Sequence, residues 1–455
     1  MLESLEFKNL GPSPELALHF GERLNLLTGD NGLGKTFVLD AAWWALTRTW
    51  PEGRMLRPDP NDPGKPEIGY HVYGVDGQNT FRWCEFDFSA EPPEWKLPQR
   101  RPPIPGLIVY ARVDGGFSIW DPARNYWREY SDSPATAPQR PSAYHFNREQ
   151  IWTGLWRTPK DEYEKNRSAL ICRGIIEDIV SWQLDPTESE TAQLFRAVLA
   201  EMSPDSEHPF ELGPLGELLG WPGKLPTLMV PFAARPVLFE FVSAGMRRIL
   251  SLVYALVWAW AEHQRAVRLT KGTATKAHRI VLLIDEIETH LHPQWQRRIL
   301  PSILRAVNLM AGANMPVQII VTTHAPLVLA SVETKFQEKT DRLFNFEQKG
   351  IGRVEVEEVP WAKFGDASGW LTSPAFDMGS GYSPEAETAI RAADDLMAGY
   401  DDALPEGLKT VEAIHEELVR TLDGGDSYWP LWLPYYREKT GSQEPPYNAE
   451  EGEEV

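Results

Sequence analysis

The residues of this chain best placed to do chemistry are a lysine and a threonine at the end of a glycine-rich stretch. Residues 29–36 read Gly-Asp-Asn-Gly-Leu-Gly-Lys-Thr, the spacing of loops that bind the phosphates of a nucleotide. The glycines allow a tight turn that brings backbone amides onto the phosphates. Lys35 reaches the β- and γ-phosphates, and the hydroxyl of Thr36 is a ligand for Mg²⁺. We therefore predict that ATP and Mg²⁺ bind here, through Gly29, Asn31, Gly32, Gly34, Lys35 and Thr36.

Such a loop needs a strand before it and a helix after it. Residues 24–27 are Leu-Asn-Leu-Leu, which favours a short buried strand, and residues 37–45 contain few helix breakers. The N-terminus of that helix adds the positive end of its dipole to the phosphate site. This context favours a phosphate-binding loop over a chance glycine turn.

A second candidate site, formed by two acidic residues, follows about 250 residues after the glycine-rich loop. Residues 281–284 are Val-Leu-Leu-Ile, typical of a central parallel strand, and Asp285 and Glu286 follow directly. An aspartate at the carboxyl end of such a strand can hold Mg²⁺, and the next glutamate can orient or deprotonate the attacking water. A buried strand that ends in charged residues is common in α/β proteins. Because a phosphate loop precedes it in the same chain, the catalytic interpretation is favoured here.

The long separation of these two motifs resembles the ATP-binding-cassette (ABC) ATPases. Residues 242–248, Val-Ser-Ala-Gly-Met-Arg-Arg, are similar to the signature Leu-Ser-Gly-Gly-Gln of that family, with Ser243 and Gly245 kept and Ala244 and Met246 departing from it. The resemblance implies that Ser243 and Gly245 grip the γ-phosphate bound by a second subunit, in a homodimer or higher oligomer with composite ATP sites. The alternative is that Ser243 simply caps the helix that follows.

Further residues match the same family. Residues 321–326, Val-Thr-Thr-His-Ala-Pro, resemble the switch segment of the family, which implies that His324 contacts the γ-phosphate and the attacking water. Gln150 is the best match for the family's metal-contacting glutamine. His290 and His292 occupy the place of the D-loop and lie two residues apart, but no third metal ligand is evident.

Three segments together resemble soluble ATPases of the SMC- and OLD-related branch. They are the glycine-rich loop, the stretch Asp-Glu-Ile-Glu-Thr-His-Leu-His-Pro and the stretch Thr-His-Ala-Pro. Residues 243–249 and 257–263 are similar to the PtuA-like ATPases of Septu and retron-associated anti-phage systems. That resemblance implies an ATPase that acts as sensor and scaffold for a separate HNH nuclease. The alternatives are an ATPase of DNA repair or chromosome maintenance, or an OLD-like nuclease-associated ATPase. The first usually brings coiled coils, and the second needs a Toprim domain where residues 361–455 instead favour helices.

The end of the chain holds an aromatic cluster, Tyr428, Trp429, Trp432, Tyr435 and Tyr436, which we expect to be exposed and to dock the partner nuclease. Alternatively, these side chains cap the chain's own ATPase core. The acidic surface would also suit a basic partner.

Composition limits the other possibilities. With 65 acidic and 45 basic residues the chain has a net charge of −20, which argues against non-specific duplex binding by the whole surface, although a local groove for nucleic acid stays open. Two distant cysteines fit a reducing compartment. No signal peptide or membrane span is evident, so we expect a cytoplasmic protein without a membrane partner.

We therefore expect an α/β fold of the ABC type, with an antiparallel β lobe, a central parallel sheet, an inserted largely helical region and a helical C-terminal tail. The expected domains are residues 1–111 with the phosphate loop, 112–235 as the insertion, 236–360 with the signature, Asp285 and His324, and 361–455 as a tail with a disordered acidic end. Expected elements include a hairpin turning at Asp76-Gly77. Expected helices cover residues 169–183, 187–202, 246–263, 291–310, 384–400 and 406–422.

Overall fold

The fold is known from a computed structural model of the chain. It describes residues 1–442 except 75–78, 98–102, 126–141, 157–169, 186–188, 206, 221–222, 231–232, 272–274, 351, 377 and 379. The contacts divide the chain into two compact units, one of Met1–Trp370 with Pro374–Phe376 and one of Leu371–Ser373 with Asp377–Val455. The expected disordered end and the Asp76-Gly77 turn lie outside the described residues.

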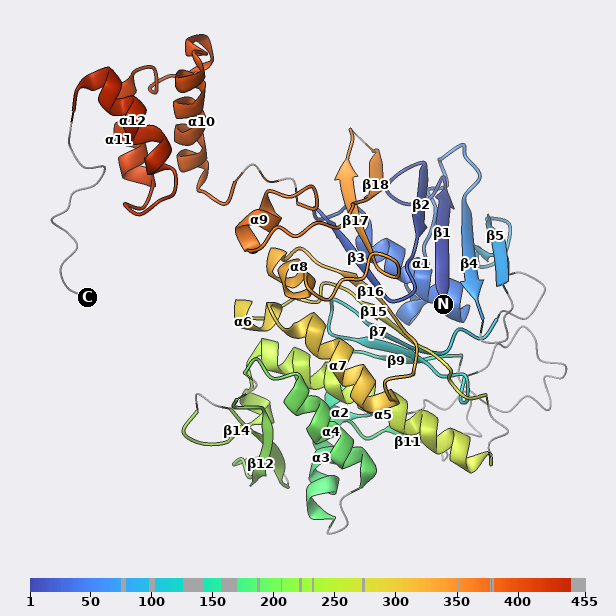
Figure 1. The fold of residues 1–455 in the computed structure, drawn as a ribbon. Coiled ribbons are helices and arrows are strands. Elements are labelled where there is room, and N and C mark those ends of the chain that lie inside the picture. The colour runs from blue at the N-terminus through green and yellow to red at the C-terminus, as the bar shows by residue number, and fades with distance from the viewer. Residues whose placement is uncertain are drawn as a thin grey trace. The chain divides into compact units, whose positions relative to one another are not determined.

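The first unit is built on a mixed sheet whose five central strands are parallel (Figure 1). Within the described residues this sheet has eight strands in the order β18-β17-β3-β16-β15-β7-β8-β9. The parallel strands are β3 (Leu24–Gly29), β7 (Leu107–Ala111), β15 (Ile280–Ile284), β16 (Val317–Thr322) and β17 (Arg342–Gln348). Antiparallel strands complete both edges: β8 (Phe117–Trp120), β9 (Tyr144–Phe146) and β18 (Val354–Glu358). The expected central parallel sheet is confirmed.

A second, antiparallel sheet encloses helix α1 (Lys35–Thr47) against the first. Its order is β2-β1-β4-β5-β6, and its strands are β1 (Leu2–Lys8), β2 (Glu15–His19), β4 (Glu67–Tyr73), β5 (Asn79–Asp87) and β6 (Glu94–Trp95). Eleven of the thirteen α1 residues are buried, including Trp43 and Trp44. A helix that is apolar on all sides must be covered on all sides, and the two sheets supply that cover. The expected antiparallel lobe is confirmed; a short 3₁₀ turn, Pro51–Gly53, follows α1.

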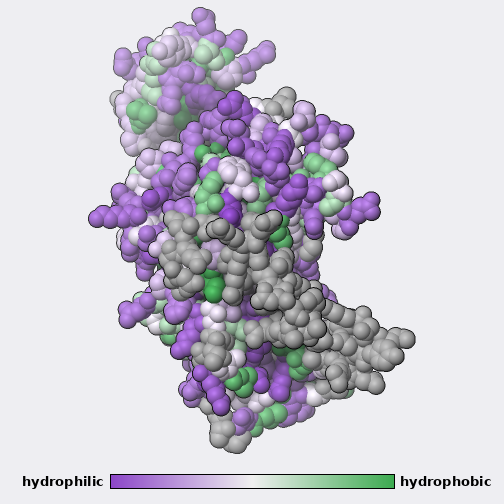
Figure 2. Space-filling view, turned by 90° about the vertical axis from the view of Figure 1, so that its right-hand side faces the viewer, coloured by the Kyte–Doolittle hydropathy of each residue, from purple (hydrophilic) through white to green (hydrophobic). Residues whose placement is uncertain are grey.

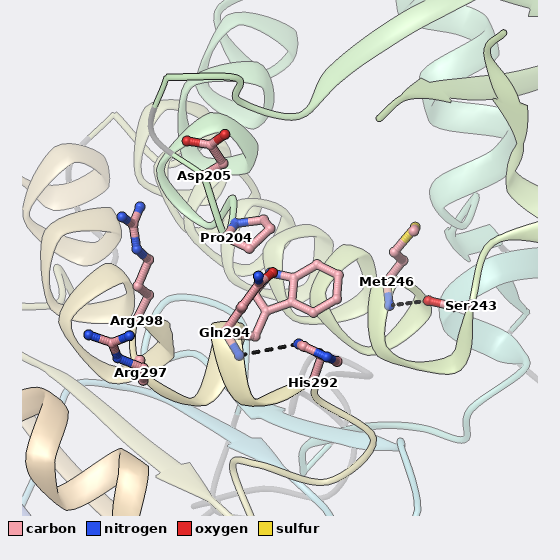
Figure 3. A pocket seen from close by; sticks show the side chains of 9 residues that line it. Pro204, Asp205, Ser243, Met246, His292, Gln294, Arg297 and Arg298 are labelled. Carbon is pink, nitrogen blue, oxygen red and sulfur yellow. Dashed lines mark hydrogen bonds between the residues drawn. The ribbon is translucent and has the colours of Figure 1, made fainter. Parts of the chain in front are cut away.

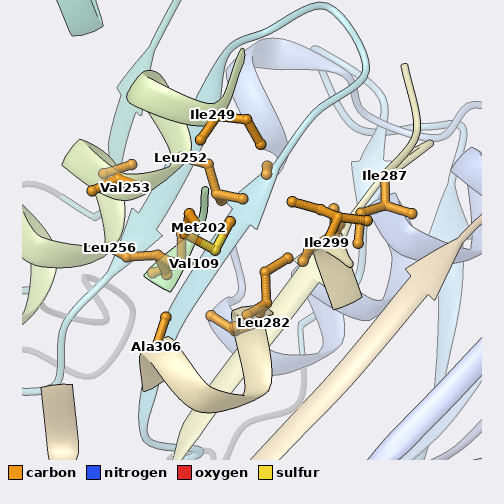
Figure 4. Close-up of a cluster of buried hydrophobic side chains, with 14 of the residues drawn as sticks. Val109, Met202, Ile249, Leu252, Val253, Leu256, Leu282, Ile287, Ile299 and Ala306 are labelled. Carbon is orange, nitrogen blue, oxygen red and sulfur yellow. The ribbon is translucent and has the colours of Figure 1, made fainter. Parts of the chain in front are cut away.

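Helices cover the other face of the main sheet. The longest, α5 (Ala244–Leu269), begins at the predicted signature and extends six residues beyond the expected end. Figure 4 shows part of the core beneath it, which includes Ile249, Val253 and Leu256 of α5 together with Val109 and Leu282 of the sheet. The other helices of this unit are α2 (Gln150–Thr153), α3 (Ile175–Leu184), α4 (Glu190–Glu201), α6 (Pro293–Gln296), α7 (Ile299–Ala311), α8 (Pro326–Val332) and α9 (Ala367–Leu371).

In this unit, two expectations of element type or extent were wrong. The helix expected over 169–183 begins only at Ile175, because Leu170–Cys172 forms β11 and pairs with β10 (Leu155–Trp156). Gly174 separates the two, with a left-handed φ of 86° and a site for Cβ only 2.5 Å from the Gly154 nitrogen. The helix expected over 291–310 is broken at Arg297 and Arg298 into α6 and α7.

Residues 112–235 hold strands as well as helices. They supply β8 and β9 to the main sheet. They also supply β12 (Glu211–Gly216) and β13 (Leu225–Met229) to a small sheet, which β14 (Val237–Leu238) completes from just beyond this region. A 3₁₀ turn, Phe239–Phe241, leads from there to α5. The four-part domain division stays a prediction, since contacts separate only the C-terminal unit from the rest.

The C-terminal unit is a small helical bundle of α10 (Pro384–Ala398), α11 (Val411–Thr421) and α12 (Trp429–Thr440), with a 3₁₀ turn at Asp401–Ala403. Its core includes Trp429 and Trp432, so the expectation that these two are exposed was wrong. The indole N–H of Trp432 donates to Nδ1 of His415 at 3.1 Å. The expected helices did not include α12, and Pro434 within it argues against a helix; burial of its tryptophans outweighs that local preference.

Hydrophilic side chains predominate on the face drawn in Figure 2, and hydrophobic ones form small separate groups there. No described helix has the length and apolar character needed to cross a bilayer.

Candidate nucleotide site

The order of the central strands brings three distant segments to one edge of the sheet. β16 lies between β3 and β15, and all three run in parallel. Parallel strands end at the same edge, so the glycine-rich loop after β3, Asp285 after β15 and His324 after β16 must meet there. Backbone hydrogen bonds continue the register, with Thr323 N–H donating to the carbonyl of Leu27 at 3.0 Å.

The glycine-rich loop has a backbone that other residues could hardly adopt. Gly29 has a φ of 121°, and a Cβ there would lie 2.3 Å from the carbonyl oxygen of Phe346. Gly34, with a φ of 97°, is the N-cap of α1. Asn31 and Gly32 are exposed in the loop, and a Cβ on Gly32 would meet nothing within 4 Å. The loop is thus fixed at its ends and open between them, as phosphate binding requires.

Lys35 folds back over the loop. Its ammonium donates to the carbonyls of Gly29 at 2.8 Å and Asp30 at 2.7 Å. Burial lowers the pKa of Lys35 to about 8, and the nearby carboxylates of Glu286 and Asp285 partly offset that effect.

Thr36 and Asp285 form a pair of oxygen ligands suited to Mg²⁺. The Thr36 hydroxyl donates to the Asp285 carboxylate, with oxygen distances of 2.9 and 3.1 Å. Burial raises the pKa of Asp285, and hydrogen bonds from Thr322 and Thr36 oppose that rise by favouring the carboxylate. A hydroxyl and a carboxylate are hard donors, so these two residues fit the ion, which would neutralise charge on the nucleotide phosphates.

Glu286 has a backbone conformation that is rare for its residue type. Its φ is 44°, in the left-handed region, and its N–H donates to the buried hydroxyl of Thr322 at 2.7 Å. The Thr289 hydroxyl donates to its carboxylate at 3.1 Å. Strain of this kind persists only where surrounding bonds enforce it, and it is often found at catalytic positions.

His324 lies beside the loop. Its pKa is lowered by burial and by the charge of Lys35, while the backbone of Gly29 has a smaller opposing effect. A neutral imidazole at pH 7 can donate and accept hydrogen bonds at once. Its backbone N–H donates to the carboxylate of Glu288 at 2.5 Å.

The predicted signature lies next to this site, at the start of α5. Ser243 caps the helix by accepting the N–H of Met246 at 3.3 Å. A Cβ on Gly245 would lie 2.6 Å from the carbonyl oxygen of His290, so no larger residue fits without displacing that segment. The half-buried Arg248 guanidinium donates to the carbonyl of Asp285 at 3.1 Å and ties the helix to the end of β15.

Ser243 opens on a cavity of about 760 Å³ that is separate from the loop (Figure 3). The cavity lies between the start of α5, α6 and the turn after α4. Among the described residues, no hydrogen bond joins Ser243 to the glycine-rich loop of its own chain. Its lining residues are Pro204, Asp205, Ser243, Met246, His292, Gln294, Trp295, Arg297 and Arg298.

The remaining predicted residues make local contacts. The side-chain oxygen of Gln150 accepts the N–H of Asn147 at 2.9 Å, and no described contact brings it to Asp285 or Thr36. Nδ1 of His292 accepts the N–H of Gln294 at 3.3 Å and caps α6. No group of three or more metal-binding side chains occurs among the described residues, His290 and His292 included.

Four residues with contacts at this site were absent from the predicted set. They are Arg248, Glu288, Thr289 and Thr322. Each lies within a motif that the sequence singled out, yet spacing alone gives no reason to choose it. The contacts of Thr322 and Glu288 depend on β15 and β16 ending side by side. Arg248 instead joins α5 to the end of β15, and Thr289 contacts Glu286 within one turn.

A phosphate loop, a paired acid and a histidine at the ends of adjacent parallel strands, with an antiparallel lobe over the loop helix, define an ATPase of the ABC type. The chain is similar to Septu protein PtuA of Bacillus thuringiensis, with 29% identity over 334 residues that cover 72% of each chain. A retron Ec83 probable ATPase of Escherichia coli is 38% identical over 55 residues, 12% of this chain and 9% of that one.

The family model described as AAA domain, putative AbiEii toxin, Type IV TA system matches residues 231–330. Among solved structures, the SMC head domain of Thermotoga maritima is similar with a TM-score of 0.37 and 14% identity, over 79% of this chain and 99% of that one. The recombination mediator protein RecF gives a TM-score of 0.36 and 12% identity over 79% and 98%. These two likenesses are too distant to add to what the strand order shows.

Proposed function

We propose that ATP joins two copies of this chain, each closing the other's nucleotide site. Lys35, Thr36, Asp285, Glu286 and His324 would act from one copy, and Ser243 and Gly245 from the other. The observation that supports this arrangement is the position of Ser243, which is exposed and opens on a cavity rather than on its own loop. A serine at a helix N-terminus offers a hydroxyl and backbone N–H groups to a phosphate from outside.

In the proposed reaction each residue has one task. Lys35 exchanges its two carbonyl partners for phosphate oxygens, and Thr36 with Asp285 holds Mg²⁺. Glu286 takes the proton of the attacking water, since its carboxylate is held by Thr289 and its backbone by Thr322. His324 donates a hydrogen bond to the γ-phosphate region from beside Gly29 and Lys35.

We further propose that the ATPase works in the cytoplasm, in anti-phage defence, and controls a separate HNH nuclease. The similarity to Septu protein PtuA over 72% of both chains supports a role in defence. The nuclease is what the resemblance to the PtuA-like ATPases implies. On this proposal the nucleotide state of the composite sites sets whether the bound nuclease is active.

The C-terminal unit is the proposed docking element, and charge rather than exposed tryptophan supports it. Residues 377–455 hold 19 of the chain's 65 acidic residues but only 5 of its 45 basic ones. They therefore carry −14 of the net charge of −20, a strong attraction for a basic, nucleic-acid-cutting partner.

Deletion of residues 377–455 tests the docking proposal. We expect ATPase activity to stay and co-purification of the proposed HNH nuclease to be lost; a retained partner would refute docking through this unit. A shorter deletion from residue 423 would remove α12 and with it Trp429 and Trp432, so it would unfold the unit rather than test its surface.

A charge reversal in the full chain separates surface from folding. Asp401 and Asp402 are both exposed, and we expect Asp401→Lys with Asp402→Lys to weaken the partner's binding, most at low salt. Glu338→Lys, an exposed acid in the first unit, is the matched control and should leave binding unchanged.

A further inference from the structure

Two side chains bridge the ends of β15 and β16. Thr322 is one of them, since its hydroxyl donates to the Asp285 carboxylate at 2.8 Å and accepts the N–H of Glu286. Glu288 makes the second bridge in the opposite direction. One carboxylate oxygen accepts the Thr323 hydroxyl at 2.8 Å, and the other accepts the backbone N–H of His324 at 2.5 Å.

The second bridge starts from a turn that also holds Glu286. The N–H of Thr289 donates to the carbonyl of Glu286 at 3.0 Å, and the N–H of Leu291 donates to that of Glu288 at 2.8 Å. The side chain of Thr289 meanwhile holds the Glu286 carboxylate. One compact turn thus fixes Glu286 from within and reaches across with Glu288 to hold the backbone of His324.

We propose that Glu288 is a positioning residue, which fixes His324 relative to Glu286 within one copy of the chain. The inference rests on the roles proposed above for Glu286 and His324. Among the described residues, no hydrogen bond or ion pair joins Glu288 to the phosphate-binding loop, and its carboxylate holds the backbone of His324 and the hydroxyl of Thr323. A misplacement of about 1 Å at a reacting centre can cost about a hundredfold in rate.

The chemistry of the bridge predicts how substitutions rank. Glu288→Ala removes both acceptors and leaves the His324 N–H and the Thr323 hydroxyl without them. Glu288→Gln keeps one carbonyl acceptor, and its amide N–H₂ can donate to the Thr323 hydroxyl, which then accepts. We therefore expect Glu288→Ala to lower kcat about tenfold or more, and Glu288→Gln to restore most of it.

Glu333 offers a matched control for a purely structural role. Its carboxylate also holds a loop, accepting the N–H groups of Phe364 and Gly365 and the indole N–H of Trp370 at 2.7 to 2.8 Å. Glu333→Ala should cost stability without lowering kcat per folded molecule. Glu288→Ala should bind a non-hydrolysable ATP analogue within about twofold of the parent chain, because the loop itself is intact.

A double-mutant cycle gives the decisive comparison. If Glu288 acts through His324, Glu288→Ala with His324→Ala is no slower than His324→Ala alone. Losses that multiply would overturn the inference, as would a Glu288→Ala chain that hydrolyses ATP like the parent. A His324→Ala chain with normal kcat would instead refute the role proposed for His324 itself.

NMR spectroscopy of chains that carry ¹³C-labelled histidine gives a readout that does not depend on turnover. The His324 signal, assigned by its loss in His324→Ala, should shift in Glu288→Ala and stay in place in Glu333→Ala. An unshifted signal in Glu288→Ala would overturn the inference even if the variant were slow.

Discussion

Thr322→Val is the substitution that most directly tests how the nucleotide site is built. Valine has nearly the shape of threonine, so the change removes one hydroxyl from a fully buried position at the end of β16. That hydroxyl is the acceptor for the Glu286 N–H at 2.7 Å and a donor to the Asp285 carboxylate at 2.8 Å. Both partners lose a contact that water cannot replace.

The expected cost follows from the two lost bonds. A buried N–H left without an acceptor costs about 1–3 kcal/mol, and a hydrogen bond to a charged group contributes about 1.5–3 kcal/mol. Because Asp285 keeps its bond from Thr36, and such terms do not add fully, we expect a loss of about 2–4 kcal/mol in unfolding free energy. Released from Thr322, the strained backbone of Glu286 should relax and lower kcat about tenfold to a hundredfold.

Thr322→Ser is the control, because serine keeps the hydroxyl and loses only a methyl group. That variant should lose about 1 kcal/mol and hydrolyse ATP nearly as fast as the parent chain. The assays are urea unfolding and steady-state ATP hydrolysis on the three chains. Equal hydrolysis by the valine and serine variants would refute the reasoning, since it would show that the hydroxyl does not hold Glu286.

Three further outcomes are expected. Glu286→Gln should bind ATP, hydrolyse it roughly a hundredfold more slowly and accumulate as a dimer by light scattering; normal turnover would show that Glu286 is not the base. Lys35→Ala mixed with Ser243→Arg should regain about one working site per dimer, and failure of two folded variants to complement would count against composite sites. Burial raises the pKa of Asp40 to about 7, so the folded chain keeps a proton that the unfolded chain has released above pH 4. Its unfolding free energy should therefore fall between pH 4 and 7 by up to about 4 kcal/mol more than that of Asp40→Asn, and parallel profiles would contradict this.

The parts of the fold that the sequence predicts well are those with a local cause. The apolar runs of β3, β15 and β16 contain no residues that break a strand. The spacing of the glycines before Lys35 is explained by a phosphate-binding loop and not by a strand or a helix. Once parallel strands were expected, the meeting of Asp285 with Thr36 followed from strand direction alone. The strand order of the sheet, with β16 between β3 and β15, cannot be predicted from any one of these segments.

The failures have non-local causes. Residues 170–172 have a composition that also suits a helix, and they form a strand because β10 pairs with them. In α12, local preference opposes a helix at Pro434, and the buried Trp429 and Trp432 stabilise one. Thr322 and Glu288 were not predicted for a similar reason, because each makes its hydrogen bonds with residues at the end of the neighbouring strand.

The contacts at the start of α5 bear on how two composite sites could influence each other. Gly245 lies against the carbonyl of His290, and Arg248 binds the carbonyl of Asp285, so the helix cannot shift without moving the turn that holds Glu286. Close-packed contacts of this kind transmit displacements rather than absorb them. If Ser243 grips a nucleotide on a second copy, the same helix carries that event to the Glu286 of its own copy. Each site would then sense the occupancy of the other through about six residues of α5, with no need for a longer path.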